Sequence, residues 1–316
     1  MGQYLIKIPL NNTGQNILKT LAYFDIFNYP LTRDDIFSFL QRKYDQSEID
    51  ETLEMLLQDK FIFKLDEFYA LQNQPILAER RRCGNHRAIK QWAIAKKAAK
   101  ILSWFPYVQT VAVSGSLSKN FSDEKSDIDF FVITSPNRLW IARTCMHLFK
   151  KLSYLAGKQN WFCMNYYVDE MRMEIIEKNI FTAMEIVTLL PLQGTNCFQN
   201  FIKANAWTNN YFPEHIISNE GTARIKKVFT RKCVEKIFNS RLGDVADKWL
   251  MNLTDKRWKQ KTQQGKVNDH GGKIGMIVSR HFSKPDPKNF QAKVVQQYEN
   301  KVKELLESTQ PIDIRL

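Results

Sequence analysis

The sequence is poor in cysteine and histidine, and neither residue type is arranged as a metal site or a disulfide framework. Its five cysteines are widely spaced without a CxxC pair, and its five histidines show no HxxxH or HxH spacing. These absences argue against a zinc knuckle, a histidine-ligated metal and a disulfide-stapled fold. Reduced thiols are the simpler interpretation, and we expect a cytoplasmic protein.

Long apolar runs are also missing. No run approaches the roughly 18 residues that span a bilayer, so we predict no transmembrane helix and no membrane partner. The stretch MGQYLIKIPLNNTG at the N-terminus has too short an apolar segment, and no cleavage site, for a secretory signal. A Walker A loop is absent as well, because Ile274 follows Lys273 in the piece GGKIG, where serine or threonine is required.

Acidic side chains are outnumbered, and the imbalance grows along the chain. The 316 residues carry 46 Lys and Arg against 33 Asp and Glu, a net charge of +13. Residues 1–75 balance to −4, residues 76–220 to +6 and residues 221–316 to +11. Such a gradient is typical of a protein that meets an anionic partner, such as nucleotide phosphates or nucleic acid, and equally of a solvated basic surface.

Residues 1–75 predict a small winged-helix-like domain. Apolar stripes at helical spacing run through residues 14–27, 28–43 and 45–61, and FIFKLDEFYALQ then alternates around a turn like a two-stranded wing. Three helices and a wing resemble a winged helix-turn-helix domain. The third helix carries five acidic residues against one lysine, which argues against DNA binding. We expect the domain to pack on its neighbour or on a protein partner.

The remaining chain predicts an α+β fold. A basic helical connector at 76–103 leads into a mixed αβ core that ends at residue 178, with MRMEII (171–176) as a hairpin partner of the strand before it. From residue 179 to 316 the patterns predict helices. The Gly-, Pro- and Lys-rich piece 268–290 interrupts them as a loop.

The stretch VAVSGSLSKNFSDEKSDIDFFVIT (111–134) places polar chemistry between two apolar strands. The first strand delivers Gly115-Ser116, where glycine permits a tight turn and the close approach of a phosphate. The second begins with an Asp-x-Asp triplet, and because side chains alternate along a strand, Asp127 and Asp129 share one face. Two carboxylates on one face can share a divalent cation, as phosphoryl chemistry requires. A hairpin with a solvated tip is the simpler alternative, but strands disfavour aspartate.

This Gly-Ser, spacer, Asp-x-Asp arrangement resembles the signature of the DNA polymerase β-like nucleotidyltransferase superfamily over roughly residues 105–180. The resemblance implies that Gly115 and Ser116 contact the phosphates of an NTP and that Asp127 and Asp129 bind catalytic Mg²⁺. It implies that residues 76–178 form a nucleotidyltransferase core with a mixed sheet. Lys119, in the same turn, is a candidate for a further phosphate contact.

The resemblance also implies a third acid in the strand FCMNYYVDE (162–170), and here the sequence departs from the pattern. The matching triplet has Asn165 at its centre. Asp169, four residues along, is our candidate for the third catalytic acid, and Glu174 is another substitute. With asparagine at this position, the protein could bind a nucleotide–metal complex yet transfer slowly or not at all.

Two hypotheses follow from the sequence. The first is a Mg²⁺-dependent nucleotidyltransferase that moves a nucleoside monophosphate from an NTP to an unidentified acceptor, which is a small molecule, an RNA or a protein. The alternative is a catalytically weak or inactive nucleotide-binding scaffold or sensor, whose winged-helix-like module binds a partner.

Overall fold

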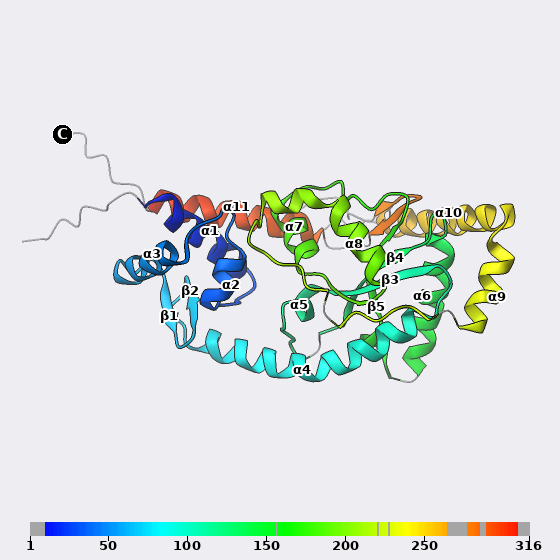
Figure 1. Ribbon diagram of the computed structural model, residues 1–316, viewed down its shortest axis with the longest axis horizontal. Helices are drawn as coiled ribbons and strands as arrows, with labels where there is room; N and C mark the ends of the chain where they lie inside the picture. The colour runs from blue at the N-terminus through cyan, green and yellow to red at the C-terminus, as the bar shows by residue number, and fades with distance from the viewer. Residues whose placement is uncertain are drawn as a thin grey trace, which may run out of the picture.

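One long helix, α4 (Ile76–Leu102), runs beneath both an N-terminal helical unit and a six-stranded sheet and joins them (Figure 1). Its 27 residues give it a length of roughly 40 Å. The computed structural model describes residues 10–124, 126–155, 157–219, 221–226, 228–263, 277–284 and 289–308. Within these ranges, every helix is too short or too polar to cross a membrane.

The N-terminal unit consists of three helices and a short antiparallel hairpin, in the predicted order. Its elements are α1 (Asn12–Asp25), α2 (Arg33–Ser38), α3 (Gln46–Gln58), β1 (Phe63–Leu65) and β2 (Phe68–Ala70). Thr32 caps α2 in a capping box with Asp35. Asp66 adopts a left-handed conformation (φ 57°) in the hairpin turn, which aspartate tolerates better than most residues. That this unit is a winged helix stays a prediction.

The core is a mixed sheet with the strand order β6-β3-β4-β5-β8-β7. The strands are β3 (Val108–Ser114), β4 (Asp129–Thr134), β5 (Cys163–Asp169), β6 (Leu190–Gln193), β7 (Ile277–Val278) and β8 (Phe282–Lys284). Among the described strands, β4 and β5 are the one parallel pair. A parallel pair needs a crossover, and α6 (Leu139–Leu155) provides it. The mixed sheet confirms the predicted α+β class.

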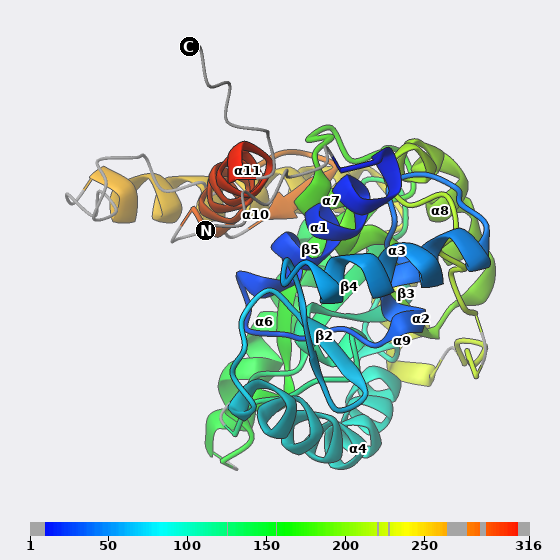
Figure 2. The same ribbon diagram turned by 90° about the vertical axis from the view of Figure 1, so that its left-hand side faces the viewer.

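The remaining helices pack around the sheet, and the last of them also contacts the N-terminal unit. They are α5 (Gly115–Ser118), η1 (Gln159–Trp161), α7 (Ile180–Val187), α8 (Thr195–Ala204), η2 (Ala206–Asn210), α9 (Phe229–Phe238), α10 (Arg241–Gln263) and α11 (Phe290–Ser308). Helix α11 packs on α1 and on α7 (Figures 1 and 2). The last described helix therefore lies against the N-terminal unit.

The prediction for residues 179–316, helices interrupted by a loop at 268–290, misses three strands: β6 lies where a helix was predicted, and β7 and β8 lie within the predicted loop. β6 pairs with β3, and β8 and β7 extend the sheet beyond β5, so the sheet crosses the predicted boundary at residue 178. Residues 171–176, predicted as the partner of β5, form no strand, and β8 occupies that edge instead. Strands of four, two and three residues are too short for a period to show in the sequence. Of the predicted loop 268–290, residues 268–276 and 285–288 lie outside the described residues.

A glycine inside α4 allows the N-terminal unit to reach the turn after β3. A Cβ on Gly84 would come within 2.1 Å of the Phe121 ring. Phe121 meets the ring of Tyr29 edge to face at 5.5 Å. The Tyr29 hydroxyl donates to the carbonyl of Lys119 at 2.5 Å. Gly84 is therefore the point where α4, the N-terminal unit and the β3 turn converge.

We expect Gly84→Ala to destabilise the protein by about 1–3 kcal/mol, because the Phe121 ring must move. Helix propensity alone predicts the opposite sign, a gain of about 1 kcal/mol. Urea unfolding measures the difference, and the double variant Gly84→Ala/Phe121→Leu should be less destabilised than the two single changes add up to. A Gly84→Ala protein more stable than wild type would contradict this packing.

Candidate active site

The antiparallel pairing of β3 with β4 brings the turn after β3 against the first residue of β4. Ser114 pairs with Asp129, and Gly115 follows with a φ of +69°, a region that favours glycine. A Cβ on Gly115 would lie 2.6 Å from Oδ2 of Asp129. Glycine is thus required both by the backbone conformation and by the neighbouring carboxylate.

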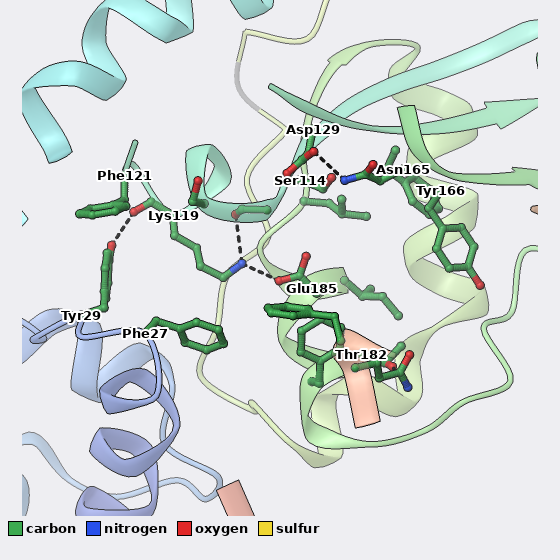
Figure 3. A pocket seen from close by; sticks show the side chains of 18 of the residues that line it. Phe27, Tyr29, Ser114, Lys119, Phe121, Asp129, Asn165, Tyr166, Thr182 and Glu185 are labelled. Carbon is green, nitrogen blue, oxygen red and sulfur yellow. Dashed lines mark hydrogen bonds and ion pairs between the residues drawn. The ribbon is translucent and has the colours of Figure 1, made fainter. Parts of the chain in front are cut away.

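A cavity of about 660 Å³ opens at this contact, between the sheet and the N-terminal unit (Figure 3). One end is polar, and its wall contains Ser114, Gly115, Ser116, Lys119, Asp129, Asn165 and Glu185. The rest is mainly aromatic, with Tyr23, Phe24, Phe27, Tyr29, Phe121, Phe131, Tyr166, Phe181 and Phe290. Four of these aromatic side chains come from residues 23–29, so the N-terminal unit supplies a wall of the cavity.

Asn165 stands at the predicted third-acid position, and its amide is bonded to Asp129. Nδ2 of Asn165 donates to Oδ1 of Asp129 at 2.6 Å, and Oδ1 of Asn165 accepts from the Cys163 thiol at 3.1 Å. The register between β4 and β5 shifts at this point, so Asn165 has no partner in the ladder and both it and Tyr166 line the cavity. The amide occupies one oxygen of Asp129 and leaves Oδ2 facing the Gly115 turn.

The carboxylate of Asp129 lies in a negative environment. Burial raises its pKa to about 6; the charges of Glu185 and Asp127 also raise it, while hydrogen bonds from Cys163 and Asn165 oppose the rise. The Asp129 charge in turn helps burial raise the pKa of the Cys163 thiol to about 12. A cation at this end of the cavity would offset the unfavourable charge.

Lys119 links the Gly115 turn to α7. Its Nζ lies 2.8 Å from Oε1 of Glu185 and donates to the carbonyl of Gly115 at 3.2 Å (Figure 3). Glu185 was not among the residues predicted from the sequence, because it comes from a helix far along the chain. Its one signal in the sequence is an acid inside the otherwise apolar run IFTAMEIV.

The structure brings most of the predicted site residues together. Gly115, Ser116, Lys119 and Asp129 line the cavity. Asp127 does not line it: this residue is exposed, just before β4, and acts on Asp129 through its charge. The predicted sharing of one strand face therefore holds only in part, because β4 begins at the second aspartate.

Asp169 lies at the opposite end of β5, and the structure does not bring it to the cavity. It pairs with the last residue of β4, Thr134, whereas Asp129 pairs at the other end. Its fully buried carboxylate accepts from the backbone N–H of Asn137 and Met171 and lies 2.9 Å from Nδ1 of His281. Asp169 thereby holds the loop after β4, and His281 directly before β8, against the end of β5. Glu174, the other substitute, forms an ion pair with Lys178.

The donor set at the polar end suits Mg²⁺. Among the described residues there is no group of three or more His, Cys, Asp or Glu side chains that could hold a metal ion. Mg²⁺ is usually held by one or two carboxylates together with substrate phosphates, so it needs no such protein cage. Asp129, with Asp127 beside it, supplies hard oxygen ligands, and the pKa of Asp129 is raised mainly by burial and further by the negative charges of Glu185 and Asp127.

The comparison with protein families identifies the region that contains this site. Residues 95–185 match the family model of a nucleotidyltransferase domain. The match covers under a third of the chain and contains the Gly115 turn, Asp129, Asn165 and Glu185. The match supports the predicted nucleotidyltransferase core. It also supports, in general terms, the transfer of a nucleoside monophosphate with a nucleotide as substrate. No curated protein and no solved structure matches the chain significantly.

The raised pKa of Asp129 has a consequence for stability that can be measured without metal or nucleotide. Because the folded pKa of about 6 exceeds the ordinary value of 3.8, the protonated carboxyl favours the folded state at low pH, and this contribution is lost as pH rises through 6. Asp129→Asn, which can still accept from Asn165, should therefore stabilise the protein near pH 7.5 by up to roughly 3 kcal/mol. The difference in free energy of unfolding between Asp129→Asn and the wild-type protein should vanish toward pH 4.

Urea unfolding at several pH values checks this expectation. Asp34→Asn is the matched control, because the Asp34 side chain is 94% exposed, and it should show no such pH-dependent gain. Equal destabilisation by Asp129→Asn at every pH would contradict the proposed environment of the carboxylate.

Proposed function

We propose that the protein is a Mg²⁺-dependent nucleotidyltransferase that moves a nucleoside monophosphate from an NTP to an acceptor hydroxyl or amine, with release of pyrophosphate. The observation that carries this proposal is the contact of Gly115 with Asp129 at the polar end of the cavity, within the matched residues 95–185. That contact joins a turn without a side chain to a carboxylate in a negative environment. Such a combination suits a phosphate held against a cation.

The polar end provides groups that bind and orient a triphosphate. The Gly115 turn allows the phosphates to approach the backbone, and Ser116 and Lys119 lie beside it. Asp127 and Asp129 would hold Mg²⁺, which when bound neutralises charge on the triphosphate and favours attack by the acceptor. Asn165 fixes one oxygen of Asp129 and keeps the other directed at the turn.

Glu185 is our candidate for the general base in place of the missing third acid. It lies in the cavity wall, close enough to Asp129 for its charge to raise the pKa of that residue. Its present partner is Lys119, at 2.8 Å. A phosphate that draws Lys119 away would leave the Glu185 carboxylate free to accept a proton from the acceptor. Because Lys119 leaves Glu185 only for a phosphate, Glu185 accepts the acceptor's proton only when the nucleotide is bound.

The second candidate function, a nucleotide-binding sensor without transfer, rests on Asn165. An asparagine at the centre of the matching triplet lacks the basicity of the carboxylate that the resemblance implies. If Glu185 does not act as the base, the site would bind the nucleotide and transfer it slowly or not at all. Binding and turnover must therefore be measured separately.

For binding, we expect each accepted NTP to raise the melting temperature of the wild-type protein only when Mg²⁺ is present. At about 100 times its Kd, the nucleotide should stabilise the fold by roughly 2.7 kcal/mol. Asp129→Asn should abolish this shift because it removes the charge that holds the metal. The matched control is Asp123→Asn, at another aspartate of the cavity wall, which pairs with Arg80 and should keep the shift. Loss of the shift in both variants, or in neither, would contradict the site.

For turnover, release of NMP from the NTP with water as acceptor measures the chemical step without the unidentified acceptor. We expect Glu185→Gln to slow this release by about 10²–10⁴-fold, the usual contribution of a general base. The Mg²⁺–NTP melting shift should remain. Glu174→Gln is the control and should leave the rate unchanged. The reverse pattern would exclude Glu185 as the base, and NTP binding without release in the wild-type protein would favour the sensor.

A further inference from the structure

A second group of polar side chains, three of them buried and His147 half-buried, lies on the face of the sheet opposite the cavity. Tyr166 faces the cavity, whereas its neighbour Tyr167 packs with the α6 side of the sheet. Within the described part of the chain, four atoms on this side are buried and have no hydrogen-bond partner: Nε of Arg143, Nε2 of His147, the hydroxyl of Tyr167 and Oγ of Ser283. Tyr167 and Ser283 are 0% exposed and Arg143 is 8% exposed.

The four side chains converge from three elements, α6, β5 and β8. Arg143 and His147 are one turn apart on α6 and therefore share a helix face. The centre of the Tyr167 ring lies 6.0 Å from the guanidinium carbon of Arg143 and 6.1 Å from the centre of the His147 ring. Ser283 is the antiparallel partner of Tyr167, so the two side chains project from the same face of the sheet.

Arg143 gives this cluster a positive charge, and no acid among the described residues is paired with it. The guanidinium carbon of Arg143 lies 5.4 Å from the centre of the Trp140 ring and 5.1 Å from that of the Trp258 ring. No ion pair of Arg143 with a carboxylate is found among the described residues, and its electrostatic neighbours include no Asp or Glu. Lys150 and Lys151 follow on the same helix, and their charges, after burial and Arg143, lower the pKa of His147 to about 3.

We propose that Arg143, His147, Tyr167 and Ser283 form a binding site for a small phosphate-type oxyanion, between α6 and the β5–β8 pair. An oxyanion supplies the missing negative charge and accepts from Arg143, from both hydroxyls and from the neutral imidazole in its Nε2–H tautomer. Burying a guanidinium together with several donors is costly unless they are paired. This site is separate from the nucleotide cavity and does not depend on its activity.

The test measures phosphate binding to the full chain in EDTA and without nucleotide. Melting temperature is followed against inorganic phosphate, with chloride and acetate controls at equal ionic strength. An arm with adenosine monophosphate distinguishes a free ion from a phosphate carried by a larger ligand. We expect saturable stabilisation by phosphate or by the monophosphate, and at least a tenfold weaker Kd in Arg143→Gln, since a charge-assisted contact is lost. No response to either ligand, or a response to acetate equal to that for phosphate, would overturn the proposal.

Tyr167→Phe separates an oxyanion site from a structural water. It removes one buried hydroxyl without a partner, so it should leave stability unchanged or raised in the absence of phosphate and reduce the phosphate response. Equal destabilisation with and without phosphate would instead show a hydroxyl bonded to a fixed water. Lys119→Met, in the nucleotide cavity, should retain the response. A response lost in Lys119→Met but kept in Tyr167→Phe would place the phosphate in the cavity and contradict the second site.

Discussion

The contact between the Gly115 turn and the Asp129 carboxylate constrains the rest of the site. The Ser114–Asp129 pair in the β3–β4 ladder leaves no space for a side chain at Gly115. The same pairing partly buries the carboxylate, and burial with two negative neighbours raises its pKa to about 6. One strand pairing thus produces both a turn without a side chain and a buried carboxylate with negative neighbours, the two features on which the proposed phosphate and cation contacts rest. Lys119 donates to the carbonyl of Gly115 on one side of this contact, and Asn165 donates to the carboxylate of Asp129 on the other.

The N-terminal unit takes part in this site through packing. Its residues 23–29 form an aromatic wall, and the Tyr29 hydroxyl is bonded to the carbonyl of Lys119 in the turn after β3. Helices α4 and α11 hold the unit in place from two sides (Figure 1). Mainly aromatic walls and one polar end are typical of a cavity for a small molecule, with orientation set by a few polar groups. The N-terminal unit therefore contributes to the proposed site as a wall of the cavity.

The sequence was most informative where local chemistry determines structure. The strand–turn–strand around Gly115 and Asp129 could be predicted because a glycine turn and acids at a strand start are local signals. The short strands β6, β7 and β8 could not, since their pairing depends on partners far along the chain. Glu185 reaches the site only through packing of α7, which no spacing reveals. Asp169 is four residues after Asn165 in β5, which separates the two by about 13 Å along the strand. Asp169 therefore lies at the other end of β5, away from the cavity.

The position of a bound metal tests the proposed site most directly. A crystal of the protein with Mn²⁺, in place of Mg²⁺, and a non-hydrolysable NTP analogue would locate the metal by its anomalous signal. We expect a peak at coordination distance from a carboxylate oxygen of Asp129, roughly 2.0–2.2 Å, with the triphosphate against the Gly115 turn. Nucleotide or metal bound elsewhere, with the Asp129–Asn165 bond unchanged and the polar end empty, would contradict the proposal.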